Sequence, residues 1–388
     1  MKKLYLLLLV LFTGLSAFAQ KTIQSKIKDL TTGEPVEMAT ISAEGTTIST
    51  VSNAEGSFRI TVPDNVSTLS ISHLNYKPFS VSIAEASGEI NLEPSVITLE
   101  EVVVSNVPVD GLLRGAVKAS KKKLEKSLLL NTYYREFVKI NGKYTRFSDG
   151  LVDFYVKRKS GAADVYVQQS RALKLVKKGD KAILTHNKDS ISAEDEKSLE
   201  NVNLYSLDDA ISGGYNFKII EKILGNSKDY NFILKTRQDK SGRDLQIVAI
   251  SPKPGSKGLY SGSVTYDTKT MLILESSYAI DPLYKQNTVD VKFFGFHVVL
   301  TANEKKTIFT NDNDKYIIKY NKGRLGMHME FRDKIDDEME FLSDVVVNNY
   351  KETEETPDKK ARFKGKSLYS AGNKFTTEFW KNSNALLL

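Results

Sequence analysis

Short runs in which apolar and polar residues alternate make up most of this chain. Phe58, Ile60 and Val62 alternate with Arg59 and Thr61, the pattern of a strand with one buried and one solvated face. Between residues 21 and 97 such runs recur about every ten residues and are separated by glycine- and proline-containing turn signals. This spacing predicts a small β-sandwich over residues 20–97.

The same alternation continues in the longer second part of the chain, residues 109–388. Asn141-Gly142 between two apolar runs predicts a tight hairpin, since both turn positions favour positive φ. Strands are predicted where aromatic and aliphatic residues alternate, and short turns between them indicate a large antiparallel sheet. The alternating sets are Tyr215, Phe217 and Ile219, then Tyr230, Phe232 and Leu234, then Leu245 and Ile247, with turns expected at Ser241-Gly242, Asp267-Thr268 and Lys322-Gly323.

A few helices are expected beside this sheet. Leu113, Val117, Leu124 and Leu128 share one stripe, which predicts a helix over residues 110–129. Its other side is rich in lysine; we interpret that side as solvated, with contact to anionic lipid as the alternative. Helix starts are also expected at Ser192-Ala193-Glu194-Asp195 and at Ser206-Leu207-Asp208-Asp209, with Gly213-Gly214 as a stop. The fold class is therefore mainly β.

The first nineteen residues have the three parts of a secretory signal peptide: Lys2-Lys3, an apolar run from Leu4 to Leu15, and Ala17-Phe18-Ala19. The run is too short for a membrane span, and no second run suggests a transmembrane helix in the mature chain. We expect a periplasmic or outer-membrane-associated protein. Removing the two lysines lowers the formal charge from +7 to +5, too mild to indicate nucleic-acid binding. Cysteine is absent, so stability must come from buried cores.

Six segments of the first module share a recognisable pattern of turn and strand residues. They are Thr32-Gly33-Glu34-Pro35-Val36, Ala39-Thr40-Ile41, Gly45-Thr46-Thr47, Gly56 to Pro63, Leu69 to Tyr76 and Leu99 to Val104. By these residues the module resembles the carboxypeptidase-regulatory-like, transthyretin-like sandwich of exported Bacteroidetes proteins. Asn75 and Asn53 replace the more usual glycine and aspartate, but asparagine also tolerates left-handed backbone. The resemblance implies an accessory sandwich without protease residues.

The second part has three segments that carry a looser resemblance: Asn131 to Glu136, Gly150 to Tyr155 and Thr377 to Asn382. By these residues it resembles uncharacterised outer-membrane-associated proteins of the same phylum. By its long antiparallel hairpins it also looks like the half-barrel of periplasmic lipoprotein carriers, so a half-barrel is one form that the sheet can take. A likeness at this level does not determine function.

Candidate chemistry is sparse, and we expect no catalytic residue, cofactor or metal. His73, His186, His297 and His328 lie far apart in the chain, without metal-ligand spacing, and His73 is interpreted as a core or boundary histidine. Asn311-Asp312-Asn313-Asp314 lacks the glycine and glutamate of a calcium loop, so a hairpin turn is expected there. Asp336-Asp337-Glu338 and Glu352 to Glu355 are interpreted as solvated charge. Nucleophile-elbow, phosphate-loop and dinucleotide motifs are absent from the sequence.

Two binding features remain. Aromatic residues are expected mostly in the core, but in a curved sheet they would line an apolar cavity for an acyl chain or sugar; these are Tyr133, Tyr134, Phe154, Tyr155, Phe293, Phe294 and Phe296. Residues 98–108 form a linker strand, in which Glu101, Val102, Val103 and Val104 either complete the sandwich, lie along the second domain, or pair with a partner.

The sequence therefore favours a non-catalytic exported module that binds a small apolar or glycan ligand or an envelope protein. The alternative is a hydrolase that acts on an envelope polymer or polysaccharide, which needs carboxylates that converge in one cleft. A third hypothesis, an integral outer-membrane barrel, is disfavoured because charged residues occur on both faces of most predicted strands.

Overall fold

The alternating runs form strands throughout the computed structural model, which is mainly β as expected. It describes residues 20–376 except 47, 54, 74–75, 95–100, 103–106, 176–205, 239–241, 294–295, 313 and 332–334. The signal peptide, His186, the helix start at Ser192, Phe294, Val103 and Val104 lie outside the described residues.

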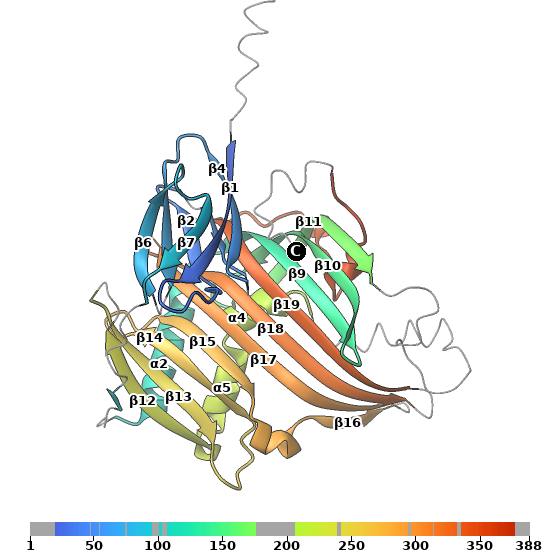
Figure 1. Ribbon diagram of the computed structural model, residues 1–388. Helices are drawn as coiled ribbons and strands as arrows, with labels where there is room; N and C mark the ends of the chain where they lie inside the picture. Colours follow the sequence, from blue (N-terminus) through green and yellow to red (C-terminus); the bar gives the residue numbers. More distant parts are fainter. Residues whose placement is uncertain are drawn as a thin grey trace, which may run out of the picture.

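The N-terminal strands form two small sheets packed face to face, drawn in blue in Figure 1. One sheet has the order β4-β1-β7 and the other β3-β2-β5-β6. Alternate residues of both sheets, such as Ile27, Ile41, Ile60 and Leu69, meet in one core between them. The strands are β1 (Gln20–Asp29), β2 (Thr40–Ala43), β3 (Ser49–Val51), β4 (Ser57–Pro63), β5 (Thr68–His73), β6 (Tyr76–Ser82) and β7 (Gly88–Leu92).

In the part of the chain that the structure describes, the second region is built on one antiparallel sheet of twelve strands. Asn141 and Gly142 both have positive φ between β9 and β10, which confirms the predicted hairpin. In pairing order the strands are β11 (Ala163–Lys174), β10 (Lys143–Val156), β9 (Leu128–Ile140), β19 (Ile335–Glu352), β18 (Lys315–Phe331), β17 (Phe296–Asp312), β15 (Ile273–Ile280), β14 (Tyr260–Asp267), β13 (Asp244–Pro252), β12 (Tyr230–Gln238) and β8 (Glu101–Val102), and β16 (Asp290–Phe293) pairs with β17.

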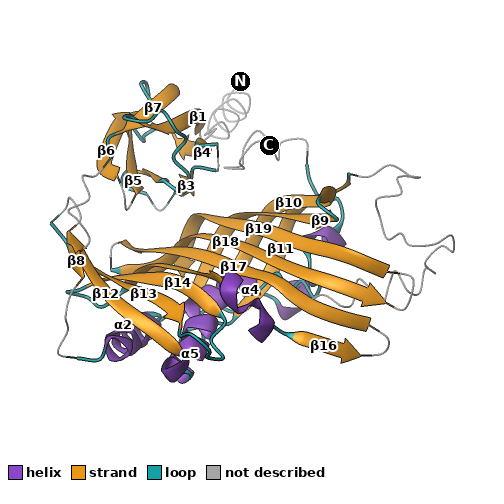
Figure 2. Cartoon of the chain, turned by 60° about the horizontal axis from the view of Figure 1, so that its bottom comes forward, coloured by secondary structure: helices purple, strands orange, loops and turns teal. Residues whose placement is uncertain are grey.

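Among the described residues, α-helices α2 (Val109–Lys123), α4 (Asp209–Tyr215) and α5 (Lys218–Gly225) cover one face of this sheet, which we call the inner face (Figure 2). Their apolar sides and the inner-face residues of the strands form the largest core of the described chain. Gly213 and Gly214 sit inside α4, where a Cβ on Gly214 would lie 2.7 Å from Cδ1 of Ile318. Gly214 therefore permits close packing of the helix on β17 and β18, and the helix ends at Tyr215, one residue beyond the predicted stop.

Several other expectations are corrected. The first helix ends at Lys123 rather than near residue 129, because the apolar run that begins at Leu128 continues as β9. Tyr215, Phe217 and Ile219 do not form a strand. Phe217 takes a left-handed conformation between α4 and α5, and Ile219 lies in α5. Lys322 and Gly323 lie in the middle of β18, not in a turn.

The expected turn at residues 311–314 is confirmed, since β17 ends at Asp312 and β18 begins at Lys315. Asp337, expected to be solvated, is only 2% exposed and accepts a hydrogen bond from Nδ2 of Asn141. Its neighbours in the chain, Asp336 and Glu338, are exposed.

The sandwich rests on the opposite, outer face of the large sheet (Figures 1 and 2). Val51 of β3 packs against Tyr133, Tyr320 and Val346 of the sheet in a small buried cluster. Buried Lys319 of β18 donates from Nζ to Oγ of Ser49 at 2.8 Å. The sandwich and the large sheet are thus joined by a small apolar cluster and a buried hydrogen bond beside it, which hold the sandwich over β18 and β19.

Candidate functional site

A row of charged residues crosses the outer face of the large sheet beside the sandwich. Its members lie on six neighbouring strands and face one another directly in the strand register, so each charge adjoins the next. In order they are Arg171, Asp149, Arg135, Asp344, Lys322 and Lys306.

Two buried ion pairs form one half of this row. Arg135 donates from Nε to both carboxylate oxygens of Asp344 at 2.8 and 2.7 Å. Arg171 donates from Nε and Nη2 to Asp149 at 3.0 Å, and Tyr133 donates its hydroxyl to the same carboxylate at 2.8 Å. Burial raises the pKa of both Asp149 and Asp344 above the ordinary value, although the arginines oppose that rise. Both carboxylates are buried, and each accepts two hydrogen bonds from its arginine.

The other half of the row is more open and contains two lysines. Lys306 and Lys322 face each other directly across β17 and β18. Each has an acidic neighbour, Glu275 at 3.0 Å from Lys306 and Glu37 of the sandwich at 2.6 Å from Lys322. Directly opposed like charges in a sheet are unfavourable, and here the two glutamates offset the repulsion between the lysines.

An apolar row runs parallel to the charged row, two residues further along each strand. Phe147, Phe137 and Leu342 face one another across β10, β9 and β19. Tyr144 packs edge-on against Phe137 and is half exposed. Next in the row Arg324 is bonded to Glu304 at 2.7 Å and to Glu340.

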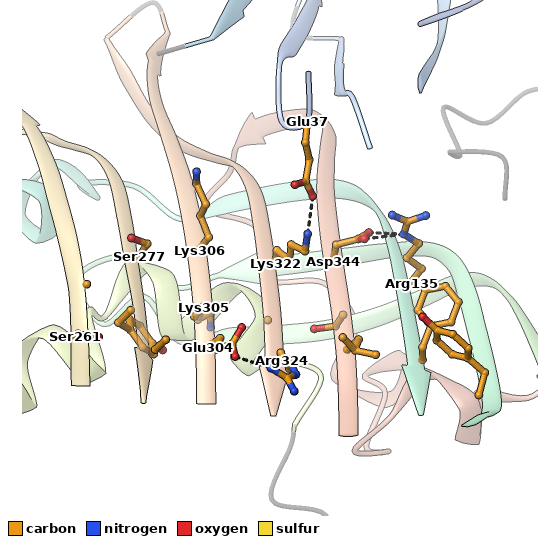
Figure 3. Close-up of a pocket in the computed structure, with 18 residues that line it drawn as sticks. Glu37, Arg135, Ser261, Ser277, Glu304, Lys305, Lys306, Lys322, Arg324 and Asp344 are labelled. Carbon is orange, nitrogen blue, oxygen red and sulfur yellow. Dashed lines mark hydrogen bonds and ion pairs between the residues drawn. The ribbon is translucent and has the colours of Figure 1, made fainter. Parts of the chain in front are cut away.

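From Arg135 and Phe137 onward, the two rows line an open groove of about 540 Å³ together with Glu37 of the sandwich. Figure 3 shows Glu37 reaching down from the sandwich to Lys322, with Arg135 and Asp344 on the neighbouring strands. Phe137, Tyr144 and Leu342 add apolar surface, and Ser261 and Ser277 border the far side. Lys305 turns to the inner face and donates to the carbonyl of Asp209 at 2.6 Å; burial lowers its pKa to about 8. A volume of this size fits a small organic ligand.

The aromatic residues proposed from the sequence as a cavity lining do not border this groove. Tyr133 lies under the sandwich, while Tyr134 and Phe154 belong to the inner-face core. Tyr155 is buried, and Phe296 stacks on Phe331 in a separate inner-face cluster. Phe293 is the last residue of β16, and the structure does not describe its side chain. The groove was missed because charged residues line much of it, and no local motif marks residues that only the sheet brings together.

The proposed partner strand is short and already paired on one side. Glu101 and Val102 form β8, which pairs with Lys235 and Thr236 of β12 at the edge of the large sheet. This segment thus lies along the second domain, one of the alternatives left open by the sequence.

The three histidines among the described residues occupy two different settings. His73 packs edge-on against Tyr76 at the boundary between sandwich and sheet, and burial, with Lys306 and Arg237 nearby, lowers its pKa to about 4. His297 and His328 are far apart in the chain, but the β17–β18 pairing places both on one face with four carboxylates. Spacing along the chain could not reveal this cluster.

Comparison with known proteins identifies the first module. Residues 23–104 match the CarboxypepD_reg-like domain. Over 104 residues the chain is 34% identical to the TonB-dependent receptor SusC of Bacteroides thetaiotaomicron, a match that takes in 26% of this chain and 10% of the receptor. The similarity therefore concerns one module, and the chain spans about a tenth of that receptor.

Similar solved structures include a LolA superfamily protein from Nitrosomonas europaea, 12% identical, covering 63% of this chain and 95% of that one at a TM-score of 0.25. A second structure is that of a putative outer membrane lipoprotein-sorting protein domain from Vibrio parahaemolyticus. It is 10% identical and covers 65% of this chain and 95% of that one, at a TM-score of 0.24. TM-scores this low do not establish a common fold. Within the described residues, every helix is too short or too polar to cross a membrane.

Proposed function

We propose that this protein is a non-catalytic binding module of the bacterial envelope, and that its ligand lies in the groove between the sandwich and the large sheet. The ligand that the groove fits best is an amphiphile with an apolar portion and an anionic group. This chemistry is shared by acylated and phosphorylated components of envelopes.

The observation that carries the proposal is the position of two opposed lysines next to an apolar row. Lys306 and Lys322 face each other on neighbouring strands, and an anionic group between them would add to the charge compensation that Glu275 and Glu37 provide. Phe137, Tyr144 and Leu342 lie in the same groove, where an acyl chain or ring would be removed from water at about 25 cal/mol per Å² of buried apolar area.

The acidic residues of the groove support a binding role rather than catalysis. Glu37 is bonded to Lys322, Asp344 to Arg135 and Glu304 to Arg324. A general acid or base needs a carboxyl group that can exchange a proton with substrate, whereas these three carboxylates are held by cations. The hydrolase hypothesis therefore finds less support in this groove than the binding hypothesis.

The envelope location is supported by the first module. Its match to the CarboxypepD_reg-like domain and its similarity to a TonB-dependent receptor of Bacteroides agree with the export signal expected at residues 1–19. In this proposal the sandwich has a direct role, because its Glu37 forms one wall of the groove.

The test uses dodecyl phosphate as the probe and dodecyl maltoside as a neutral probe with the same chain, both below their micellar concentrations. Titration calorimetry on the mature chain should show one dodecyl phosphate per chain and weaker binding of the maltoside. Changing both lysines, Lys306→Gln with Lys322→Gln, should weaken dodecyl phosphate about tenfold, equivalent to about 1.4 kcal/mol, and leave the maltoside unchanged.

Two further variants locate the site. Leu342→Glu should weaken both probes, since it places a charge on the apolar row. Lys351→Gln removes an exposed lysine of β19 outside the groove and should change neither affinity. Equal affinities for all variants, or no saturable binding by the wild type, would contradict the proposal.

A further inference from the structure

A second cluster of polar side chains lies on the outer face of the large sheet, where β16 to β19 run beyond the sandwich (Figure 1). His297 opposes Glu330 across β17 and β18, and His328 opposes Glu338 across β18 and β19. On the inner face of the same strands, Phe296, Met327, Met329 and Phe331 are buried together. Because a one-residue slip would expose these apolar residues, they fix the register of the histidines.

The two histidines make contacts of different kinds. His297 has both ring nitrogens at 2.8 Å from a carboxylate, Nδ1 from Glu330 and Nε2 from Asp290. These are ordinary lengths for charge-assisted hydrogen bonds. His328 instead has a single nitrogen, Nε2, near two carboxylates, at 3.3 Å from Oε1 of Glu330 and 3.2 Å from Oδ1 of Asp336.

A proton does not account well for the second arrangement. Nε2 carries at most one hydrogen, so it can donate a full hydrogen bond to only one of the two carboxylates, and these repel each other. A metal ion among the three atoms accounts for it better. Tetrahedral zinc with bonds of about 2.0–2.1 Å holds its ligand atoms about 3.3–3.4 Å apart, close to the two separations at His328. The three ligand atoms also lie within 4.8 Å of one another.

We propose that His328 Nε2, Glu330 Oε1 and Asp336 Oδ1 form a binding site for a divalent transition metal ion, with zinc as the best fit. Nitrogen with two carboxylate oxygens is a donor set that zinc accepts, and three protein ligands leave a fourth position for water or for a group from a partner. All three protein ligands come from β18 and β19, which are neighbouring strands of the sheet.

The surrounding residues are placed as supporting groups of such a site. Oε1 of Glu338 lies 3.1 Å from Nδ1 of His328, and a carboxylate there fixes the tautomer that leaves Nε2 free to bind metal. The second oxygen of Glu330 is held by His297, which is held in turn by Asp290. Each metal-binding side chain on β18 therefore has an orienting partner, as metal sites in proteins usually require.

This site is separate from the proposed binding groove, because none of its residues lines that groove. Its loss would leave the groove intact, and failure of the groove proposal would not affect it.

The test titrates the mature chain with zinc chloride against a chromophoric chelator, in parallel with magnesium and calcium. We expect one zinc ion per chain and no competition by a hundredfold excess of calcium or magnesium. His328→Gln should weaken zinc at least a hundredfold. Glu338→Gln and His297→Gln, which alter only the supporting groups, should each weaken it about tenfold.

The matched control is Glu352→Gln, which removes a carboxylate from the same strand β19 where it is bonded to Lys126; zinc affinity should stay within twofold. X-ray absorption of the loaded protein should show a first shell of nitrogen and oxygen with one imidazole. Thermal melting without metal checks that each variant is folded. Sub-stoichiometric zinc, or an affinity that His328→Gln leaves unchanged in a folded variant, would overturn the proposal.

Discussion

The buried pair Arg135–Asp344 provides the sharpest test of how the charged row is held together. The two side chains are 13% and 10% exposed and are joined by two hydrogen bonds from Nε. Removing one partner of a buried pair costs about 3–5 kcal/mol, whereas replacing both by apolar residues is often neutral. Arg135→Met leaves Asp344 beside Lys322, and Asp344→Val leaves Arg135 beside Asp149, so we expect the lower end, about 3 kcal/mol, for each change.

The double variant should be destabilised by less than about 2 kcal/mol, whereas the two single losses of about 3 kcal/mol each would add to about 6. The difference is a coupling energy of about 4 kcal/mol or more between the two side chains; independent side chains would have a coupling energy of zero. The pH dependence separates the two single variants. The carboxyl group left by Arg135→Met already has a raised pKa and becomes neutral as the pH falls, so its penalty shrinks. The guanidinium left by Asp344→Val stays charged at every accessible pH, so its penalty persists.

Urea unfolding followed by far-ultraviolet circular dichroism measures the free energy of unfolding at pH 7 and pH 5. Each variant is compared with the wild type at the same pH. Lys351→Gln, in the same sheet and exposed, serves as the control and should change stability by less than about 0.5 kcal/mol. Single-variant losses below about 1 kcal/mol that add in the double variant would refute the reasoning, because they are typical of a solvent-screened surface pair.

Three further predictions concern the sandwich. The pKa of His73 is about 4 in the folded protein and about 6.5 in the unfolded chain. The free energy of unfolding should therefore fall by up to about 3 kcal/mol as the pH drops from 6.5 to 4. His73→Phe should remove this part of the pH dependence of the urea midpoint. Val51→Asp places a carboxylate in the buried contact with the sheet and should split calorimetric unfolding into two transitions, while Val51→Ala, costing about 1–2 kcal/mol, should keep one. Gly56→Ala should lower the melting temperature more than Gly45→Ala. Both glycines have positive φ, but only at Gly56 would an added Cβ clash with a carbonyl oxygen, that of Ile27 at 2.2 Å.

Local patterns in the sequence predicted a sandwich and a large antiparallel sheet, but not the pairing of β9 with β19, which lie far apart in the chain. Asn141-Gly142 specifies its hairpin because both residues adopt positive φ, and the alternating runs around Phe58 and Tyr230 became β4 and β12. The pattern misled where strand and helix periods overlap. Tyr215, Phe217 and Ile219 alternate, but Ile220, Ile223 and Leu224 also share one helix face, and packing against the inner face selected the helix.

The candidate groove depended on features that no short pattern reveals, namely two single-residue bulges. Counting back from the Asn141-Gly142 turn would place Arg135 opposite Ser148; the extra residue at Thr145 shifts the pairing by one and brings Asp149 opposite instead. An extra residue at Lys319 likewise brings Lys322, rather than Asn321, opposite Lys306. A shift of one residue exchanges the two faces of a strand, so without these bulges the charged row would be broken. Lys319 is also the residue whose amine bonds to Ser49, so the same bulge that aligns the lysines holds the sandwich beside them.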